Sequence, residues 1–217
     1  KYGTDVFQKL DGMFAFAIYD SRINKLLICR DYIGIKTLYY HPIDNGIVFA
    51  SEVKAIIASS FYKPCINKFQ LPNFFFNRSV YGGETMFLNV FKLLPGHFIE
   101  YDLEKFCFKI NSFTPKYLKE DFKKEKLENL LSKEIRSHLQ ADCDVSLALS
   151  GGIDSSIIAY FASLDKRKIS TFNIKTLSEF DESVYAESIS KLIKSKHFSV
   201  LLNSESMIKY FDKWALY

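Results

Sequence analysis

The sequence predicts an α/β chain in two parts: an α+β domain with antiparallel sheets, followed by a parallel, doubly wound α/β domain. Through about residue 112, short apolar runs occur in pairs separated by turn-like residues, which is typical of β-hairpins. From residue 120 onward, strands alternate with helical patterns of about 11–15 residues, which is typical of βαβ units. Pro115 and several lysines mark residues 113–119 as a linker. We therefore place the domains at residues 1–112 and 120–217.

Three strand pairs are expected in the first domain, because each pair joins two apolar runs through a short turn. In chain order they are Met13–Tyr19 with Lys25–Arg30, Thr37–His41 with Gly46–Ala50, and His97–Asp102 with Phe106–Ile110. Asn45-Gly46 is a strong signal for the second turn, and Pro95-Gly96 introduces the third pair. Both runs of the second pair are apolar nearly throughout, which predicts a sheet covered on both faces.

Two helices and one ion pair are also expected in this domain. Glu52–Ser59 has its aliphatic residues on one stripe, as an amphipathic helix requires. Asn67–Phe76 has a helical pattern too, although Pro72 would disrupt a helix interior. Arg30 and Asp31 are expected to form a buried, architectural ion pair.

The second domain is expected to alternate helices and strands. In chain order the elements are helix Glu120–Gln140, strand Val145–Leu149, helix Ile153–Leu164, strand Ile169–Ile174, helix Glu182–Lys194, strand His197–Leu202 and helix Glu205–Tyr217. Large apolar residues expected on buried helix faces are Leu127, Leu130, Leu131, Ile135 and Leu139 in the first helix, and Tyr185, Ile189, Leu192 and Ile193 in the third. By the right-handed crossover rule, ligands bind at the carboxyl ends of such strands.

One strand–helix junction has the residues of an anion site. Val145–Leu149 reads as a short buried strand, and Ser150–Ser156, with the sequence S-G-G-I-D-S-S, turns from it into the helix. The first amides of a helix lack an intrahelical partner, and the helix dipole favours negative charge there. Gly151 and Gly152 allow a phosphate close to the backbone, the serines add hydroxyl donors, and Asp154 offers a carboxylate suited to Mg²⁺.

The alternative for this junction is an ordinary strand–helix turn with a serine cap. The complete string S-G-G-I-D-S-S in its strand–helix context favours the phosphate site. Asp181 leaves two alternatives open as well, because it follows the next strand and begins the next helix. It is either a capping residue or a residue that reaches the nucleotide.

Composition argues against several classes of protein. The chain has 217 residues, 48% of them hydrophobic and 25% charged, and a net charge of +4. The lysine-rich stretch 116–126 also contains acidic residues, so no nucleic-acid partner is expected. No apolar window reaches about 18 residues, so no membrane partner is expected. The four cysteines lack a C-x-x-C pair, which predicts no zinc site, buried free thiols and a cytoplasmic location.

Five motifs, taken together, resemble one family. S-G-G-I-D-S-S resembles the pyrophosphate loop of the ATP pyrophosphatase superfamily, whose members adenylate a substrate. Leu10–Asp20 (L-D-G-M-F-A-F-A-I-Y-D), Arg30–Tyr40 (R-D-Y-I-G-I-K-T-L-Y-Y), Phe49–Ile56 (F-A-S-E-V-K-A-I) and the turn Leu94–His97 resemble the later part of a class II glutaminase domain. Together they resemble glutamine-hydrolysing asparagine synthetases, in which the synthetase domain follows the glutaminase domain.

This resemblance implies an ATP-dependent amide ligase that converts ATP, aspartate and glutamine to asparagine, glutamate, AMP and pyrophosphate through a β-aspartyl adenylate. ATP and Mg²⁺ are then the expected cofactors, with Asp154 as the Mg²⁺ ligand, and the full-length protein is expected to be a homodimer. The implied ATP-binding residues are Leu149, Ser150, Gly151, Gly152, Asp154, Ser155, Ser156 and, against adenine, Ile174. Two alternatives remain: an acceptor that is another carboxylate, such as a sugar acid, and a non-catalytic nucleotide-binding protein.

The chain also departs from the family pattern. Thr37 replaces the proline of G-I-K-P-L-Y-Y, and Asp142–Ser146 reads D-C-D-V-S where the family often has D-V-P-V-G. The nucleophilic cysteine that follows the initiator Met is absent, as is the later S-G-x-G-x-D-E loop. No catalytic residue is therefore assigned. We expect a fragment of a longer enzyme, inactive by itself.

Overall fold

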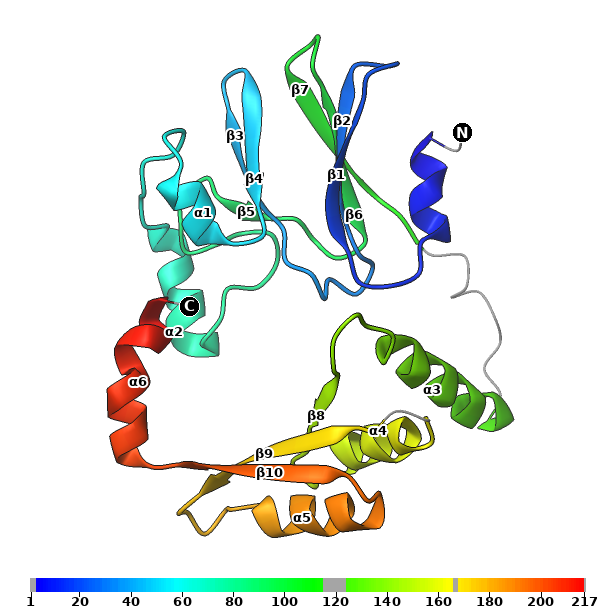
Figure 1. The fold of residues 1–217 in the computed structure, drawn as a ribbon. Helices are drawn as coiled ribbons and strands as arrows, with labels where there is room; N and C mark the ends of the chain where they lie inside the picture. The colour runs from blue at the N-terminus through cyan, green and yellow to red at the C-terminus, as the bar shows by residue number, and fades with distance from the viewer. Residues whose placement is uncertain (1–2, 115–123, 166–167, 217) are drawn as a thin grey trace. The chain divides into compact units, whose positions relative to one another are not determined.

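The computed structural model describes residues 3–114, 124–165 and 168–216 (Figure 1). The chain forms two compact units, Lys1–Glu120 and Asp121–Tyr217, which are described separately. Most of the expected linker, residues 115–119, lies outside the described residues. The first unit contains antiparallel sheets and the second a parallel sheet with helices, which confirms the expected α/β class.

Two antiparallel sheets form the first unit (Figure 1). One has the strand order β1 (Ala15–Asp20), β2 (Lys25–Arg30), β6 (His97–Asp102) and β7 (Cys107–Ser112). The other has the order β4 (Gly46–Ala50), β3 (Tyr39–Ile43) and β5 (Phe91–Lys92). The three expected strand pairs are confirmed, since β1 pairs with β2, β3 with β4 and β6 with β7. The sequence does not predict β5, because two residues are too few for a detectable periodicity.

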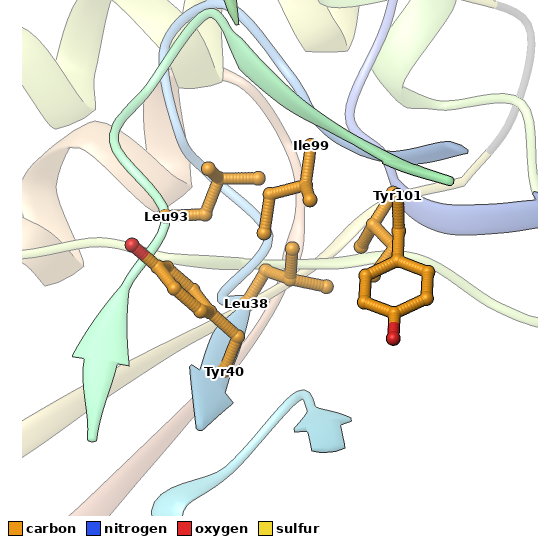
Figure 2. Packing of buried hydrophobic residues seen from close by; sticks show 6 residues of the cluster. Leu38, Tyr40, Leu93, Ile99 and Tyr101 are labelled. Carbon is orange, nitrogen blue, oxygen red and sulfur yellow. The ribbon is translucent and has the colours of Figure 1, made fainter. Parts of the chain in front are cut away.

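A cluster of buried side chains joins the two sheets. Its members come from the strands and the segments that flank them: Ile28, Leu38, Tyr40, Leu93, Ile99 and Tyr101. Figure 2 shows these side chains gathered between the strands. On the other face of the first sheet, Leu27 and Cys29 pack with Phe7, Phe98 and Phe113. Because successive residues of a strand point to opposite faces, β2 supplies both clusters, and side chains pack on both faces of this sheet.

The helices of the first unit include one that the sequence does not predict. The 3₁₀ helix η1 (Gly3–Lys9) buries its phenylalanine against the first sheet. Helices α1 (Val53–Ala58) and α2 (Leu71–Asn77) confirm the two expected helices. Helix α2 follows a short 3₁₀ turn, η2 (Lys68–Gln70), so Pro72 lies in its first turn, where the missing N–H costs no hydrogen bond.

Arg30 and Asp31 are buried as expected, but the partners of their charged groups are backbone carbonyls and amides. The Arg30 guanidinium donates to the carbonyl oxygens of Gly34, Lys36 and Leu93 at 2.6, 2.7 and 2.6 Å. The Asp31 carboxylate accepts the amides of residues 34–36 at 2.6, 2.9 and 2.9 Å. The two side chains thus fix the loop between β2 and β3. Among the ion pairs of the described residues none joins Arg30 to Asp31, so the expected direct pair is wrong.

A parallel sheet with the strand order β10–β9–β8 forms the second unit. The elements are α3 (Lys124–His138), β8 (Ser146–Ala148), α4 (Ile153–Ser163), β9 (Ser170–Thr176), α5 (Ser183–Leu192), β10 (Lys196–Leu202) and α6 (Ser204–Leu216) (Figure 1). All the expected elements are present, with shifted ends. Because each new strand is added on the same side, right-handed crossovers place α4 and α5 on one face of the sheet. There Ala159 of α4 and Ala186 of α5 pack with Leu149.

The buried face of α5 differs from the expected one. Tyr185 and Leu192, which the sequence places on the buried stripe, are 65% and 76% exposed. Ile189 and Ile193 do pack inward, but they share their face with Ala186, which is fully buried. The pattern of large residues therefore misses this face, because a small residue lies at its centre.

Helix α3 and strand β8 are less buried than the sequence predicts. In α3, Leu127 and Leu130 are exposed, whereas Leu139, just beyond the helix, is buried with Ala162. Residues 120–123 of the expected helix lie outside the described residues. Of the expected buried strand Val145–Leu149, three residues form β8, and of the five residues the last alone is buried. Within the described sheet β8 is an edge strand, which leaves one of its sides without a neighbour.

The four cysteines are free thiols, as expected, but one of them is buried and three are not. Burial raises the pKa of the Cys29 thiol in β2 to about 12. Cys65, Cys107 and Cys143 are exposed, which contradicts the expected burial, because they lie in loops or at the start of an edge strand. In the part of the chain that the structure describes, no helix has the length and apolar character to cross a membrane.

Candidate functional site

The segment Ser150–Ser156, called the loop here, contains the turn after β8 and the first four residues of α4, at the carboxyl edge of the parallel sheet. Leu149, the residue before it, donates its amide to the Phe172 carbonyl of β9 at 2.7 Å. The strand ladder thus extends one residue beyond β8 and holds the start of the loop. The Leu149 side chain is 1% exposed and packs with Ala159 and Ala186. Leu149 therefore anchors the start of the loop, and almost none of its surface is open to solvent.

Gly151 adopts a conformation that residues with a side chain rarely take. Its φ is +84°, and a Cβ atom there would lie 2.5 Å from Tyr185 Cβ and 2.6 Å from the Ala186 nitrogen. The loop backbone therefore lies directly against α5, at a distance that excludes any side chain. Gly152, the N-cap of α4, has an ordinary extended conformation, with φ −67° and ψ 164°.

The three serines brace the loop from within. The Gly152 carbonyl accepts the Ser156 amide at 3.0 Å and the hydroxyls of Ser155 and Ser156 at 3.1 and 2.7 Å. The Ser150 hydroxyl accepts the Gly152 amide at 3.2 Å and lies 3.0 Å from the Ser155 hydroxyl. The sequence predicts these hydroxyls as phosphate donors, and in the structure each of them also makes a contact within the loop. The amides of residues 153–155 precede the first intrahelical donor, Ser156, and are the groups that a helix N-terminus offers to an anion.

Asp154 lies in the first turn of α4 and is exposed. Within residues 3–114, 124–165 and 168–216, no group of three or more His, Cys, Asp or Glu side chains could hold a metal ion by itself. Mg²⁺ is usually bound by one or two carboxylates, and waters and substrate phosphates supply the other ligands. One exposed carboxylate beside a phosphate-type loop fits that mode, so Asp154 could hold Mg²⁺ together with a nucleotide.

Ile174 shares the carboxyl edge of the sheet with this loop. Strand β9 continues to Thr176, so the expected strand end at Ile174 is wrong by two residues. The Ile174 side chain is 65% exposed, and its neighbour Asn173, which points to the opposite face, is buried. Because parallel strands end at the same edge, the topology brings Ile174 and the loop to one side of the unit. The structure leaves this apolar side chain accessible there.

Asp181 is engaged in the connection between β9 and α5. One of its carboxylate oxygens accepts the Thr176 amide at 3.0 Å, and the other accepts the Ser183 hydroxyl at 2.5 Å. The Ser183 hydroxyl, followed by the Thr176 amide, lowers the pKa of Asp181 from its usual range. These contacts tie the end of β9 to the start of α5, whereas the N-cap residue of α5 is Glu182, which makes no side-chain cap hydrogen bond. The sequence string D-E-S signals the serine contact, but nothing in it identifies Thr176 as the second partner.

Two family models match the chain in order. Residues 1–113 match a model described as a glutamine amidotransferase domain, and residues 126–217 match one described as asparagine synthase. The chain belongs to the asparagine synthetase family. The asparagine synthase match contains every residue that the sequence predicts for ATP binding, from Leu149 to Ile174.

Curated relatives are similar to most of the chain. A putative glutamine-hydrolysing asparagine synthetase 2 of Methanocaldococcus jannaschii is 27% identical over 99% of the chain and 44% of the relative. Glutamine-hydrolysing asparagine synthetase 1 of Bacillus subtilis is 32% identical over 91% of the chain and 33% of the relative. Amidase chry2 of Gibberella zeae is 30% identical over 73% of the chain and 24% of the relative. The chain thus spans less than half the length of these relatives.

Proposed function

We propose that this chain contributes the ATP-cleaving loop of a glutamine-hydrolysing asparagine synthetase. The reaction converts ATP, aspartate, glutamine and water to asparagine, glutamate, AMP and pyrophosphate by way of a β-aspartyl adenylate, the water being used to release ammonia from glutamine. One observation carries the proposal: S-G-G-I-D-S-S forms a strand–helix turn at the carboxyl edge of a parallel sheet, in a chain whose first unit matches a glutamine amidotransferase domain. Such an edge is where α/β sheets bind nucleotides.

ATP binding is proposed for this loop and the next strand. The residues are Leu149, Ser150, Gly151, Gly152, Asp154, Ser155, Ser156 and Ile174. The amides of residues 153–155 and the dipole of α4 stabilise negative phosphate oxygens. The serine hydroxyls keep the turn in shape through the Gly152 carbonyl, and Leu149 anchors it to β9. Ile174 offers the adenine an exposed apolar surface.

Asp154 is proposed to hold Mg²⁺, which when bound neutralises part of the charge on the leaving pyrophosphate. That charge grows as the bond between the α- and β-phosphates breaks, so donors already fixed at the N-terminus of α4 stabilise it without rearrangement. Ammonia from glutamine then displaces AMP from the adenylate. Water has to be excluded at this stage, because it would hydrolyse the same reactive ester.

The proposal is tested by incubating the whole protein with ATP, Mg²⁺, glutamine and aspartate. Asparagine and pyrophosphate are expected in equal amounts, since one ATP is cleaved for each amide formed. Pyrophosphate release that ignores aspartate and requires another carboxylate would contradict the asparagine assignment. A protein that binds ATP and releases no pyrophosphate with any carboxylate would be a nucleotide-binding protein without this activity.

A second candidate is amide formation on a carboxylate other than aspartate. It is raised by relatives that are not named asparagine synthetases: besides Amidase chry2, Amidase chyE of Penicillium rubens is 29% identical over 73% of the chain and 24% of the relative. The ATP loop would have the same role in both candidates, because in each of them the acceptor's carboxylate attacks the α-phosphate of ATP and pyrophosphate leaves. Pyrophosphate release measured with a panel of amino-acid and sugar carboxylates separates the two.

A further inference from the structure

The proposed ATP loop lies against the main chain of α5. An added Cβ at Gly151 would lie 2.7 Å from the Tyr185 carbonyl carbon and 2.6 Å from the Ala186 nitrogen, in addition to 2.5 Å from Tyr185 Cβ. Two of these three atoms belong to the backbone, which cannot rotate away as a side chain can. The first turn of α5 therefore sets the position that the loop can occupy.

Asp181 fixes that first turn. Its carboxylate bridges Thr176, the last residue of β9, and Ser183, the first residue of α5. Ser183 is buried, so its hydroxyl depends on this partner more than an exposed hydroxyl would. Tyr185 and Ala186 follow Ser183 within the same helical turn. Asp181 thus links the end of β9 to the start of α5, and the first turn of α5 in turn lies against Gly151.

We infer that Asp181 is a positioning residue for the loop Ser150–Ser156, and that it acts by holding the first turn of α5 against Gly151. The inference deepens the proposed function and rests on it, because it takes ATP as the ligand of the loop. Both carboxylate oxygens of Asp181 already have protein partners, so its effect on the nucleotide passes through α5. The carboxylate is charged at neutral pH, as any aspartate with an ordinary or lowered pKa is, and there it interacts favourably with the dipole of α5.

The test measures the affinity of the whole protein for α,β-methylene-ATP with Mg²⁺ by isothermal titration calorimetry. Asp181→Ala is expected to weaken this affinity by about tenfold, the typical effect of losing one hydrogen bond to a charged group. Ser183→Ala should weaken it in the same direction. The double variant should lose no more than Asp181→Ala alone, because both residues act through one contact. Glu179→Ala, at an exposed acid in the same connection, is the matched control and should bind as the wild type does.

Two further variants separate positioning from stability. Ile169→Val removes one methyl group from the cluster with Leu139 and Ala162 at the amino end of β9, and should lower the melting temperature without changing ATP affinity. Asp181→Asn keeps one oxygen acceptor and should give a smaller loss of affinity than Asp181→Ala. If the alanine variant does not fold, the asparagine variant still tests the inference.

The outcomes distinguish the inference from the function on which it rests. If the wild type binds the analogue and both Asp181 variants bind it within twofold of the wild type, Asp181 is structural and the inference is overturned alone. Additive losses in the double variant would also overturn it, because the two residues would then act by separate routes. If the wild type does not bind the analogue, the proposed function is wrong and the inference falls with it.

Discussion

At the scale of single residues, Gly151 and Gly82 allow the cost of backbone strain to be compared with the cost of a steric clash. Gly151 and Gly82 have similar backbone conformations, with φ of +84° and +77°. An added Cβ at Gly151 would meet the backbone of α5, whereas at Gly82 it would meet nothing within 4 Å. An alanine at either position would have a strained backbone. At position 151 it would also have to push α5 away, whereas at position 82 it would meet no neighbour.

Gly151→Ala should therefore destabilise the chain more than Gly82→Ala. Gly82→Ala is expected to lower the free energy of unfolding by about 1 kcal/mol, the cost of a left-handed conformation for a residue with a side chain. Gly151→Ala adds a clash with α5 and should lower it by about 3 kcal/mol, with at least a tenfold loss of ATP affinity. Urea unfolding and calorimetric titration measure the two quantities. Equal destabilisation by the two variants would argue against close contact with α5.

The cysteines should differ in reactivity because the thiolate is the reacting form. Cys29 is buried, with a pKa of about 12, whereas Cys65, Cys107 and Cys143 are exposed. At about pH 8, Ellman's reagent should therefore react quickly with three thiols of this chain, and with the fourth after denaturation. A Cys29→Ser variant is the control: it should show the same three fast thiols, and no further thiol should react after denaturation. Fast reaction of all four in the native chain would contradict the burial of β2.

At the scale of elements, α5 shows how small residues define a buried face. Ala186, Ile189, Ser190 and Ile193 have the spacing i, i+3, i+4 and i+7, which is one face of a helix. Two of the four are small, and both are buried. Small side chains allow α5 to approach the sheet and the Gly151 backbone closely. The larger Tyr185 and Leu192 lie beside this face and are exposed.

Ile189→Ala and Leu192→Ala should therefore have very different effects. Ile189 packs into the cluster of Leu149, Ala159 and Ala186, so its truncation should lower the free energy of unfolding by about 2 kcal/mol. Leu192→Ala at an exposed site should change it by less than about 0.5 kcal/mol. Urea unfolding followed by circular dichroism measures both. A larger effect for Leu192→Ala would support the face that the sequence predicts.

At the scale of the whole molecule, the two units have separate cores and separate proposed chemistry. The buried clusters of the first unit lie between and beside its antiparallel sheets, and those of the second lie under α4 and α5. A substitution at an exposed residue of the second unit should therefore leave the amidotransferase fold intact. Asp154, in the first turn of α4, is such a residue.

Asp154→Ala in the whole protein should separate the two half-reactions. Pyrophosphate release should fall by at least about a hundredfold, because the proposed Mg²⁺ ligand is lost, while glutamine hydrolysis should continue. The melting temperature should stay within about 1 °C of the wild type, since Asp154 is exposed. Unchanged pyrophosphate release in a folded variant would rule out the metal role of Asp154.

The sequence by itself determined the longer helices and strands in their order, the three hairpin pairs and the place of the candidate loop. Turn residues such as Asn45-Gly46, apolar runs and the string S-G-G-I-D-S-S are local signals, readable within a few residues. Only the tertiary structure decided which groups meet. Arg30 donates to the carbonyl of Leu93, far along the chain, and Asp31 accepts the amide of Gly34 in the loop that follows it. The hydroxyls of Ser155 and Ser156 donate to the Gly152 carbonyl, and Gly151 lies against α5. These contacts join segments that lie apart in the chain or depend on its exact turn, so they follow from how strands and helices pack and not from local periodicity.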